Sequence, residues 1–264
     1  MKKCFFELRI VATIVACLAV SVALVGCGKE NGDDVGDGPL VTEIIYDDGW
    51  RETFEYDSQN RITKMTSYDD GKVRSFETLS YNSEGDLISL TRNYPDYPDN
   101  DETMTFTKNG NTITMNRSFA DEVFELNAQG LLGKTTREAS SEKLIITYQY
   151  QEKNLTTVTE DVEANWNGEN YKRFTTITFT YDDKKGAFYH CKTPQWYLVR
   201  MYVHYFGIQN NPKTSIFTRD GSVRATETFE YTYNDEGFPI TITMKYEDDD
   251  DNVDTTNITL KYNN

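Results

Sequence analysis

The stretch FEYDSQNRIT, from Phe54 to Thr63, sets the pattern of the chain. Its two aromatic residues are two positions apart, which places both rings on one face of a strand. Asp57 is suited to end that strand, because an Asp or Asn at the first position of a type I turn caps the turn through its side chain. The residue three places later often takes a positive φ, and Asn60 occupies that place. Ile62 then restarts the apolar alternation, so the stretch predicts a strand, a tight turn and a second strand.

Degenerate copies of this unit recur along the chain. They are Leu79, Tyr81, Asn82, Gly85 and Leu87; Phe124, Leu126, Asn127, Gly130 and Leu132; Tyr231, Tyr233, Asn234, Gly237 and Ile240; and Phe179, Tyr181 and Asp182, with Gly186 one place late. The chain closes on Tyr262 and Asn263, as if a further unit were cut short. These copies resemble the YD repeat of bacterial wall-associated and Rhs-type proteins, which implies an array of β-hairpins.

The first 26 residues have the pattern of a lipoprotein signal peptide. A positively charged start is followed by the apolar run Ile10 to Val25, which is short of the roughly 20 residues that a spanning helix needs. Leu24-Val25-Gly26-Cys27 resembles the site that is cut before a lipidated cysteine. Residues 1–26 are therefore predicted to be a signal peptide and Cys27 to carry lipid. An uncleaved membrane anchor is the alternative.

Residues 27–41 are predicted to be a flexible acidic tether, because they are rich in glycine and acids and offer nothing to bury. Of the four cysteines only Cys191 would remain as a thiol in the mature chain. Removal of three positive charges and one negative charge with the leader takes the formal charge from −16 to −18. Such a charge disfavours nucleic acid and anionic lipid surfaces as partners.

The leader, the length and the degenerate copies together resemble a family of small lipoproteins from gut anaerobes, a domain of unknown function with a porin-like fold. The resemblance covers Val41 to Asn264. It implies an all-β envelope protein, and it carries no known catalytic residues onto this chain. Acidic residues after Cys27 also resemble the tag that sends such lipoproteins to the cell surface; a periplasm-facing outer membrane lipoprotein is the alternative.

Residues 42–264 are predicted to form a single all-β domain. Strand signals are dense, and from Thr175 to Tyr181 apolar and threonine positions alternate without error. Turn signals separate the runs at short intervals and predict about 14 strands. The expected fold is one antiparallel β-meander, strongly twisted, and either barrel-like or curled into a half-shell. A transmembrane barrel would need an apolar outer band, whereas the face opposite the core is rich in Thr, Glu, Lys and Arg.

Residue types that carry chemistry are few. His190, His204 and Cys191 lack the spacing of a zinc site, and neighbours on a strand point to opposite faces, so no metal, no cofactor and no cysteine–histidine pair is predicted. The acidic run 247–254, EDDDDNVD, lacks the glycine and glutamate of a calcium loop and is predicted to be a solvated hairpin loop. Asp254-Thr255-Thr256 resembles a bacterial O-glycosylation acceptor. A glycan-processing enzyme would need a pair of carboxylates, and the 43 acidic residues single none out.

The stretch that departs from the repeat runs from Phe188 to Phe206. Read as a strand, its second half is apolar or aromatic on both faces. One face should line the core, and the other needs a cover, which is either the same chain or a partner. A binding patch of Trp196, Tyr202 and Phe206 for a glycan, a peptide or another envelope protein is therefore predicted, with internal cover as the alternative. The functional hypothesis is a non-catalytic surface binding module, and the alternative is a structural or assembly lipoprotein.

Overall fold

The structure is a computed structural model that describes residues 38–117, 120–166, 169–202 and 206–263. The predicted signal peptide and most of the predicted tether, with Cys27, lie outside the described residues, as does His204. In the part of the chain that is described, no helix is long and apolar enough to cross a membrane.

The described residues form sixteen strands, which close into a barrel. In chain order they are β1 (Val41–Tyr46), β2 (Trp50–Tyr56), β3 (Ile62–Asp69), β4 (Lys72–Tyr81), β5 (Leu87–Asn93), β6 (Glu102–Asn109), β7 (Thr112–Asn116), β8 (Glu122–Leu126), β9 (Leu132–Ala139), β10 (Glu142–Gln151), β11 (Asn154–Trp166), β12 (Glu169–Lys185), β13 (Asn210–Arg219), β14 (Ser222–Tyr233), β15 (Pro239–Asp248) and β16 (Val253–Tyr262). A 3₁₀ turn, η1 (Pro98–Asn100), lies between β5 and β6, and helix α1 (Gln195–Tyr202) lies between β12 and β13.

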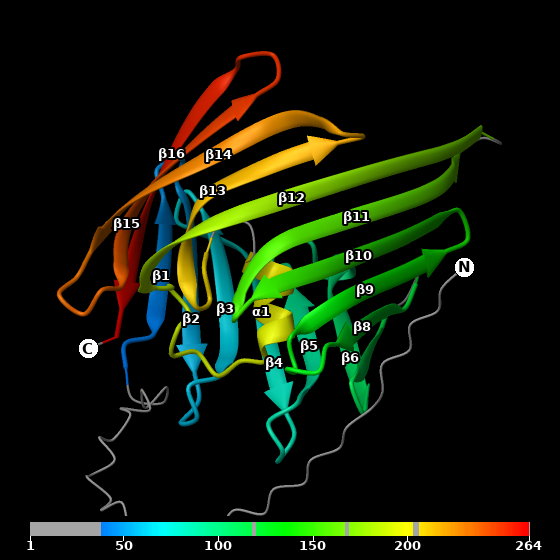
Figure 1. The fold of residues 1–264 in the computed structure, drawn as a ribbon. Coiled ribbons are helices and arrows are strands. Elements are labelled where there is room, and N and C mark those ends of the chain that lie inside the picture. Colours follow the sequence, from blue (N-terminus) through cyan, green and yellow to red (C-terminus); the bar gives the residue numbers. More distant parts are fainter. Residues whose placement is uncertain (1–37, 118–119, 167–168, 203–205, 264) are drawn as a thin grey trace, which may run out of the picture. The chain divides into compact units, whose positions relative to one another are not determined.

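Each strand pairs antiparallel with the strand next to it in the chain, and β16 pairs with β1 (Figure 1). The predicted all-β antiparallel meander is therefore confirmed. The half-shell alternative is wrong, because β1 and β16 pair in register from Val41↔Tyr262 to Tyr46↔Ile258 and leave no free edge between them.

The predicted strand number of about 14 is too low. Between Gly130 and Asn167 the chain makes two tight turns, at residues 140–141 and 152–153. Neither turn contains Gly, Asn, Asp or Pro, and Glu152 itself takes a φ of 57°. Turn chemistry in the sequence does not mark such positions, because a glutamate in the left-handed region is uncommon.

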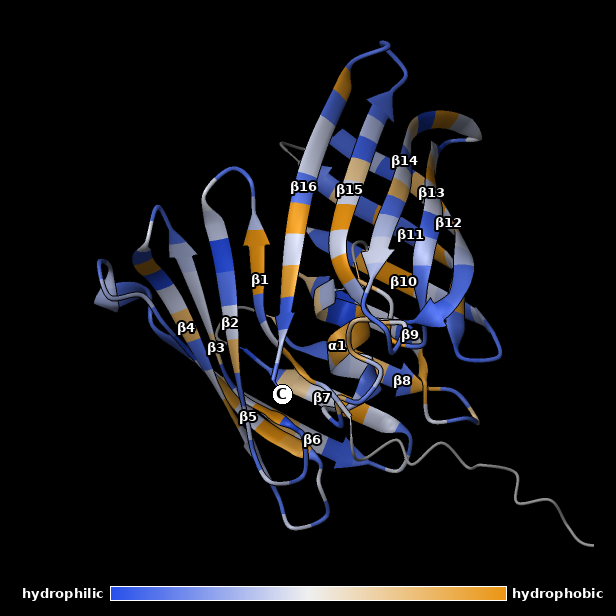
Figure 2. Cartoon of the chain, turned by 90° about the vertical axis from the view of Figure 1, so that its left-hand side faces the viewer, coloured by the Kyte–Doolittle hydropathy of each residue, from blue (hydrophilic) through white to orange (hydrophobic). Residues whose placement is uncertain are grey.

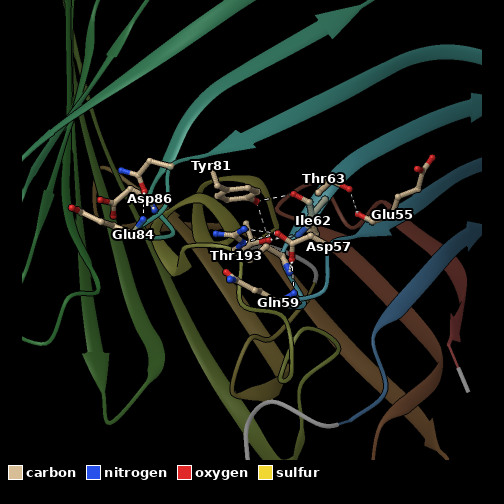
Figure 3. Close-up of polar contacts among 11 residues, drawn as sticks. Glu55, Asp57, Gln59, Ile62, Thr63, Tyr81, Glu84, Asp86 and Thr193 are labelled. Atoms are coloured by element: carbon tan, nitrogen blue, oxygen red, sulfur yellow. Dashed lines mark hydrogen bonds and ion pairs between the residues drawn. The ribbon is translucent and has the colours of Figure 1, made fainter.

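The turns of the repeat have the predicted construction (Figure 3). Asp57 Oδ1 accepts hydrogen bonds from the backbone N–H of Gln59 at 2.9 Å and of Arg61 at 3.0 Å, and Asn60 has a φ of 62°. The same pair of bonds, to the residues two and four places on, is accepted by Asn82, Asn127, Asn234 and Asp248. The Asp248 turn joins β15 to β16, so the acidic run 247–254 contains a further copy of the repeat.

The repeat's tyrosines tie strands together inside the barrel. Five of them donate the hydroxyl to the carbonyl of a residue near the start of the preceding strand, over 2.6–2.8 Å, whereas Tyr233 donates its hydroxyl to the carboxylate of Asp182. The pairs are Tyr56 to Val41, Tyr81 to Ile62, Tyr181 to Leu155, Tyr231 to Pro212 and Tyr262 to Pro239. Burial raises the pKa of all five hydroxyls, which keeps them protonated as donors. These positions in the repeat therefore serve the fold.

The two walls of the barrel differ in character. On β12, Phe179 is buried at 6% exposure, whereas its neighbours Thr178 and Thr180 are exposed, which confirms the predicted alternation. Along the strands, orange and blue positions alternate in the same way (Figure 2). Threonine, lysine and glutamate dominate the outward positions, so the outer wall is suited to contact with water.

The space enclosed by the wall is filled in part by the connection from β12 to β13. We call this connection, residues 186–202 and 206–209, the plug; its helix α1 lies inside the barrel (Figures 1 and 2). At its base, a Cβ on Gly186 would collide with the carbonyl oxygen of Gly207, so glycine is required there for close backbone approach. Gly186 does not have the positive φ of the repeat's other glycines.

The plug corrects two predictions. The stretch from Trp196 is a helix, and the predicted exposed patch is wrong: Trp196, Tyr202 and Phe206 are only 5%, 7% and 3% exposed. A helix inside a closed barrel meets inward side chains on several sides, and this is why it is apolar in more than one direction. Ring centroids of Trp196 lie 5.4 Å from Phe106 and 4.9 Å from Phe124, on β6 and β8. The alternative of internal cover is therefore correct.

The barrel has two different ends. The plug connects at the end that carries the Asx-capped turns of β2–β3, β4–β5, β8–β9 and β14–β15, and we call this the closed end. Leu40 donates its N–H to Asn263 Oδ1 at 2.6 Å, and Asn263 donates to the Leu40 carbonyl at 3.0 Å, so both ends of the described chain meet there. We call the opposite end the mouth. Near it, the inward Glu142, Arg137, Glu160 and Arg173 side chains keep 29–32% of their surface exposed, which shows that solvent reaches the lumen.

Candidate functional site

A cavity of about 480 Å³ lies between α1 and the inner wall of β8 to β13. We call it the lumenal cavity. Its lining is Glu122, Arg137, Leu144, Ile146, Tyr148, Val158, Glu160, Thr175, Ile177, Val199, Arg200 and Phe217. Alternate residues of neighbouring strands supply most of this lining, and α1 supplies Val199 and Arg200.

A second cavity, of about 420 Å³, lies against β12 to β15. We call it the side cavity. Its lining is Ile177, Ser215, Phe217, Arg219, Ala225, Glu227 and Tyr246. Because Ile177 and Phe217 line both cavities, the two spaces adjoin across an apolar boundary.

Arginine–glutamate pairs follow the inner wall. They are Arg92–Glu77, Arg117–Glu102 at 3.4 Å, Arg200–Glu122 at 3.0 Å, Arg137–Glu142 at 2.5 Å and Arg173–Glu160 at 2.6 Å. Strand register alone would place Arg137 opposite Glu122. Arg200 of α1 takes Glu122 in its place, so the helix completes the charge pattern of the wall.

The plug, and with it Arg200, is fastened to the wall by polar contacts. Ile62 donates its N–H to Thr193 Oγ1 at 2.8 Å (Figure 3). Lys192 donates its N–H to the Asn60 carbonyl at 2.9 Å. On the other side of α1, Tyr197 donates its hydroxyl to Glu77 Oε2 at 3.1 Å. The turn that opens the repeat therefore positions the helix that borders the lumenal cavity.

Two inward carboxyl groups are not neutralised by a cation. Burial raises the pKa of Glu52, and its Oε2 has no hydrogen-bond partner. Burial also raises the pKa of Glu227, whose carboxyl accepts a hydrogen bond from Ser215 Oγ. Their surroundings favour the protonated form of both groups.

The candidates from the sequence lie elsewhere. His190 is 7% exposed, and its ring lies 5.4 Å from that of Phe238; burial raises the pKa of the neighbouring Cys191 thiol. Within the described ranges, no three His, Cys, Asp or Glu side chains are placed to hold a metal ion. Asp248 caps a hairpin turn as the loop prediction for 247–254 requires, but the loop is shorter than predicted: β15 continues to Asp248 and β16 begins at Val253, so only residues 249–252 connect them. The O-glycosylation of Asp254-Thr255-Thr256 and the lipidation of Cys27 stay predictions.

The lining of the two cavities was not among the residues predicted from the sequence. The sequence did contain a signal for a polar interior, because several charged residues fall at strand positions that share a face with core residues. Glu77 precedes Leu79 by two places, Arg92 follows Leu90 by two, and Glu122 precedes Phe124 by two. Charged residues on the core face of a strand are expected only where they are paired or where they line a solvated space.

Comparison with known proteins gives structural neighbours only. No protein-family profile and no curated protein matches the sequence. Among solved structures, a porin-like protein from Bacteroides uniformis is similar at 13% identity and a TM-score of 0.40, over 84% of this chain and 96% of its own. A porin-like protein from Bacteroides vulgatus is similar at 12% identity and a TM-score of 0.37, over 85% and 99%.

The geometry of the lumen indicates what it can accept. The lumenal cavity combines a set of aliphatic side chains with ion pairs whose members neutralise one another. Such a lining suits a small ligand with an apolar body, oriented by a few polar contacts.

Proposed function

We propose that this protein is a non-catalytic binding module that takes a small, largely apolar ligand into the barrel through the mouth. The observation that carries the proposal is the lumenal cavity of about 480 Å³ between α1 and the inner wall. Its volume falls within the range of small-molecule sites. The predicted binding role is kept, while the site moves from the surface to the lumen.

The lining supports a ligand with an apolar body. Leu144, Ile146, Val158 and Ile177 come from β10, β11 and β12 and form one aliphatic wall, and Val199 of α1 also lines the cavity. Transfer of apolar ligand surface from water to such a wall is favourable by about 25 cal/mol per Å².

The charged groups support binding over catalysis. Glu122 and Glu160 line the cavity, and each is paired with an arginine, Arg200 and Arg173. A carboxylate whose oxygens are held by an arginine is already engaged, which leaves it less available for proton transfer to a ligand. These pairs are better suited to orient a polar group of a ligand.

In this proposal the module is located in the cell envelope. Cys27, which lies outside the described residues, is the predicted lipid attachment site, and it provides the contact with the membrane. Strand β1 begins at the closed end, so the preceding segment joins the barrel there, at the end opposite the mouth. Display on the outer face of the outer membrane, with the mouth accessible from outside, fits the acidic residues that follow Cys27; a periplasm-facing orientation is the alternative. Nucleic acid is not among the proposed partners.

The experiment fills the cavity with a larger side chain and measures dye binding. N-phenyl-1-naphthylamine, an uncharged dye that becomes fluorescent in apolar surroundings, is titrated into the mature domain. The test variant is Ile146→Trp, which places an indole in the cavity. The matched control is Ile145→Trp, because Ile145 is the adjacent residue on β10 and points to the outer wall.

We expect one saturable site in the wild-type protein and in Ile145→Trp, and at least tenfold weaker binding in Ile146→Trp. Circular dichroism and thermal unfolding of both variants establish that they fold. If Ile146→Trp binds the dye as well as the control does, or if the wild type does not bind it, the lumenal cavity is not a binding site. The structural or assembly role then becomes the better hypothesis.

A further inference from the structure

We propose that the ligand carries a carboxylate, which Arg219 binds in the side cavity while the apolar body of the ligand extends into the lumenal cavity. The inference rests on the proposed function, and it adds the chemical class of the ligand: a monoanionic acid on an apolar body.

Arg219 differs from the other arginines of the inner wall. Arg92, Arg117, Arg137, Arg173 and Arg200 each form an ion pair with a glutamate. Among the described residues, no carboxylate lies within ion-pair distance of Arg219; the guanidinium carbon lies 5.5 Å from the centre of the Phe217 ring. Its Nε is buried without a hydrogen-bond partner. A buried guanidinium donor without an acceptor is costly, and an anion in the side cavity would satisfy it.

A second guanidinium group reinforces the positive charge at this place. Arg219 pairs in register with Thr175, and Arg173 lies two residues from Thr175 on the same strand. The two arginines are therefore diagonal neighbours on the inner wall, about 7–8 Å apart between backbones. Arg173 pairs with Glu160 through its terminal nitrogen Nη2. Its Nε, like that of Arg219, is buried without a hydrogen-bond partner.

The balance of charge around the side cavity is positive. Arg219 is the cation in the lining, and its diagonal neighbour Arg173 pairs with Glu160. The acid in the lining, Glu227, accepts a hydrogen bond from Ser215, and burial raises its pKa, which favours the neutral acid. A local excess of positive charge inside a protein whose formal net charge is −16 is the arrangement expected where an anion binds.

The anion position adjoins the apolar wall. Ile177 and Phe217 border both cavities, so a ligand whose carboxylate contacts Arg219 would lie across these two side chains. Its apolar body would then reach Ile146 and Val158 in the lumenal cavity. The guanidinium of Arg219 matches a carboxylate in shape, because a carboxylate can accept two parallel hydrogen bonds from it.

The experiment compares an acid with its uncharged ester. Binding of cis-parinaric acid and of its methyl ester, both below their critical micelle concentrations, is followed by fluorescence at pH 7.5. The variants are Arg219→Gln and, as matched control, Arg224→Gln, because Arg224 is exposed and pairs with Asp249 away from the lumen. Arg219→Lys keeps the charge and provides a second variant if Arg219→Gln is unstable.

We expect the wild type to bind the acid at least tenfold more tightly than the ester. Arg219→Gln should lose this preference while its affinity for the ester stays the same, Arg219→Lys should keep part of it, and Arg224→Gln should keep all of it. Equal affinity for acid and ester in the wild type, or an unchanged preference in Arg219→Gln, would overturn the assignment of the carboxylate.

The ester separates this result from the proposed function. If the ester binds and Ile146→Trp abolishes its binding, the lumenal cavity is a binding site even when Arg219 makes no difference. If neither compound binds and N-phenyl-1-naphthylamine does not bind either, the proposed function itself fails.

Discussion

The inner and outer walls of the barrel are built from the same strands, yet they form ion pairs of different kinds. On the inner wall the cations are arginines, with side chains 15–32% exposed. On the outer wall the cross-strand pairs that lie directly opposite in register use lysine: Lys64–Glu55, Lys134–Glu125, Lys172–Glu163 and Lys261–Glu43, with lysine side chains 39–73% exposed. Arg51, 37% exposed, also pairs with the outer Glu43, from a diagonal position.

The difference follows from the dielectric surroundings of each wall. A lysine in water gains little from a neighbouring glutamate, because both groups are well solvated and the interaction is screened. An arginine that faces a partly enclosed lumen is easier to desolvate, and its planar donors match a carboxylate. Inner pairs should therefore matter for stability and for the site, whereas outer pairs should matter mainly for solubility.

The largest effect is expected when an inner pair is broken. Arg200→Met leaves Glu122, whose side chain is 7% exposed, without its cation. We expect a loss of about 2–3 kcal/mol in the free energy of unfolding at pH 7, because a buried charge without its partner costs several kcal/mol and Arg200 is itself only partly buried. Urea denaturation of the variant and of the wild type measures the difference. A loss below about 1 kcal/mol would show that the inner pairs are as weak as surface pairs.

A second effect, on the pH dependence of stability, is expected at Glu52, an inward-facing glutamate that has no cationic partner. Burial raises the pKa of Glu52 above its ordinary value of 4.5, so the folded state binds its proton more tightly than the unfolded state does. The contribution of this group to stability is present below pH 4.5 and is lost as the pH rises through the folded-state pKa. Glu52→Gln removes this dependence, so its stability relative to wild type should increase from pH 4 to pH 8. Unfolding curves across this range test the sign, with the outer Glu55→Gln as control; a relative stability that is constant or falls with pH would contradict it.

The smallest effect is expected on the outer wall. Lys172→Ala removes the partner of Glu163 from a pair whose lysine side chain is 73% exposed. We expect no change in the free energy of unfolding beyond the error of the measurement at either low or high salt, because water and ions screen both charges. Urea denaturation at low and high salt is the measurement. A loss comparable to that of Arg200→Met would remove the distinction between the walls.

Much of the barrel wall could be predicted from the sequence, because its turns and its alternation depend on residues that are close together in the chain. The turn at Asp57 needs only an Asx side chain and a residue that tolerates positive φ, and alternation with period two identifies the core face. Turns without these residues, such as that at Glu152, were missed for the same reason. Closure of the ring could not be predicted, because it depends on the pairing of β1 with β16 across more than 200 residues.

The helix of the plug was wrongly predicted to be a strand, because apolar residues point to all sides of this segment. An apolar segment without clear periodicity can be a strand that is buried on both faces or a short helix that is buried all round. Thr193-Pro194 directly before α1 is the signal that could have decided for the helix, since proline is common at helix starts. The cavities themselves depend on which wall residues surround α1, and no local pattern contains that information.

The meeting of β1 and β16 at the closed end has a consequence for how the barrel forms. Most neighbouring strands are joined by short hairpins, so their pairings can form early and at small entropic cost. The seam between β1 and β16 joins the two ends of the described chain, and its pairing brings together residues that are farther apart in sequence than those of any hairpin. Closing the seam is therefore expected to be a late event in folding, and until it closes the meander exposes two strand edges that can pair with other chains. The interval before the seam closes is therefore when this protein is most exposed to misassembly with other chains.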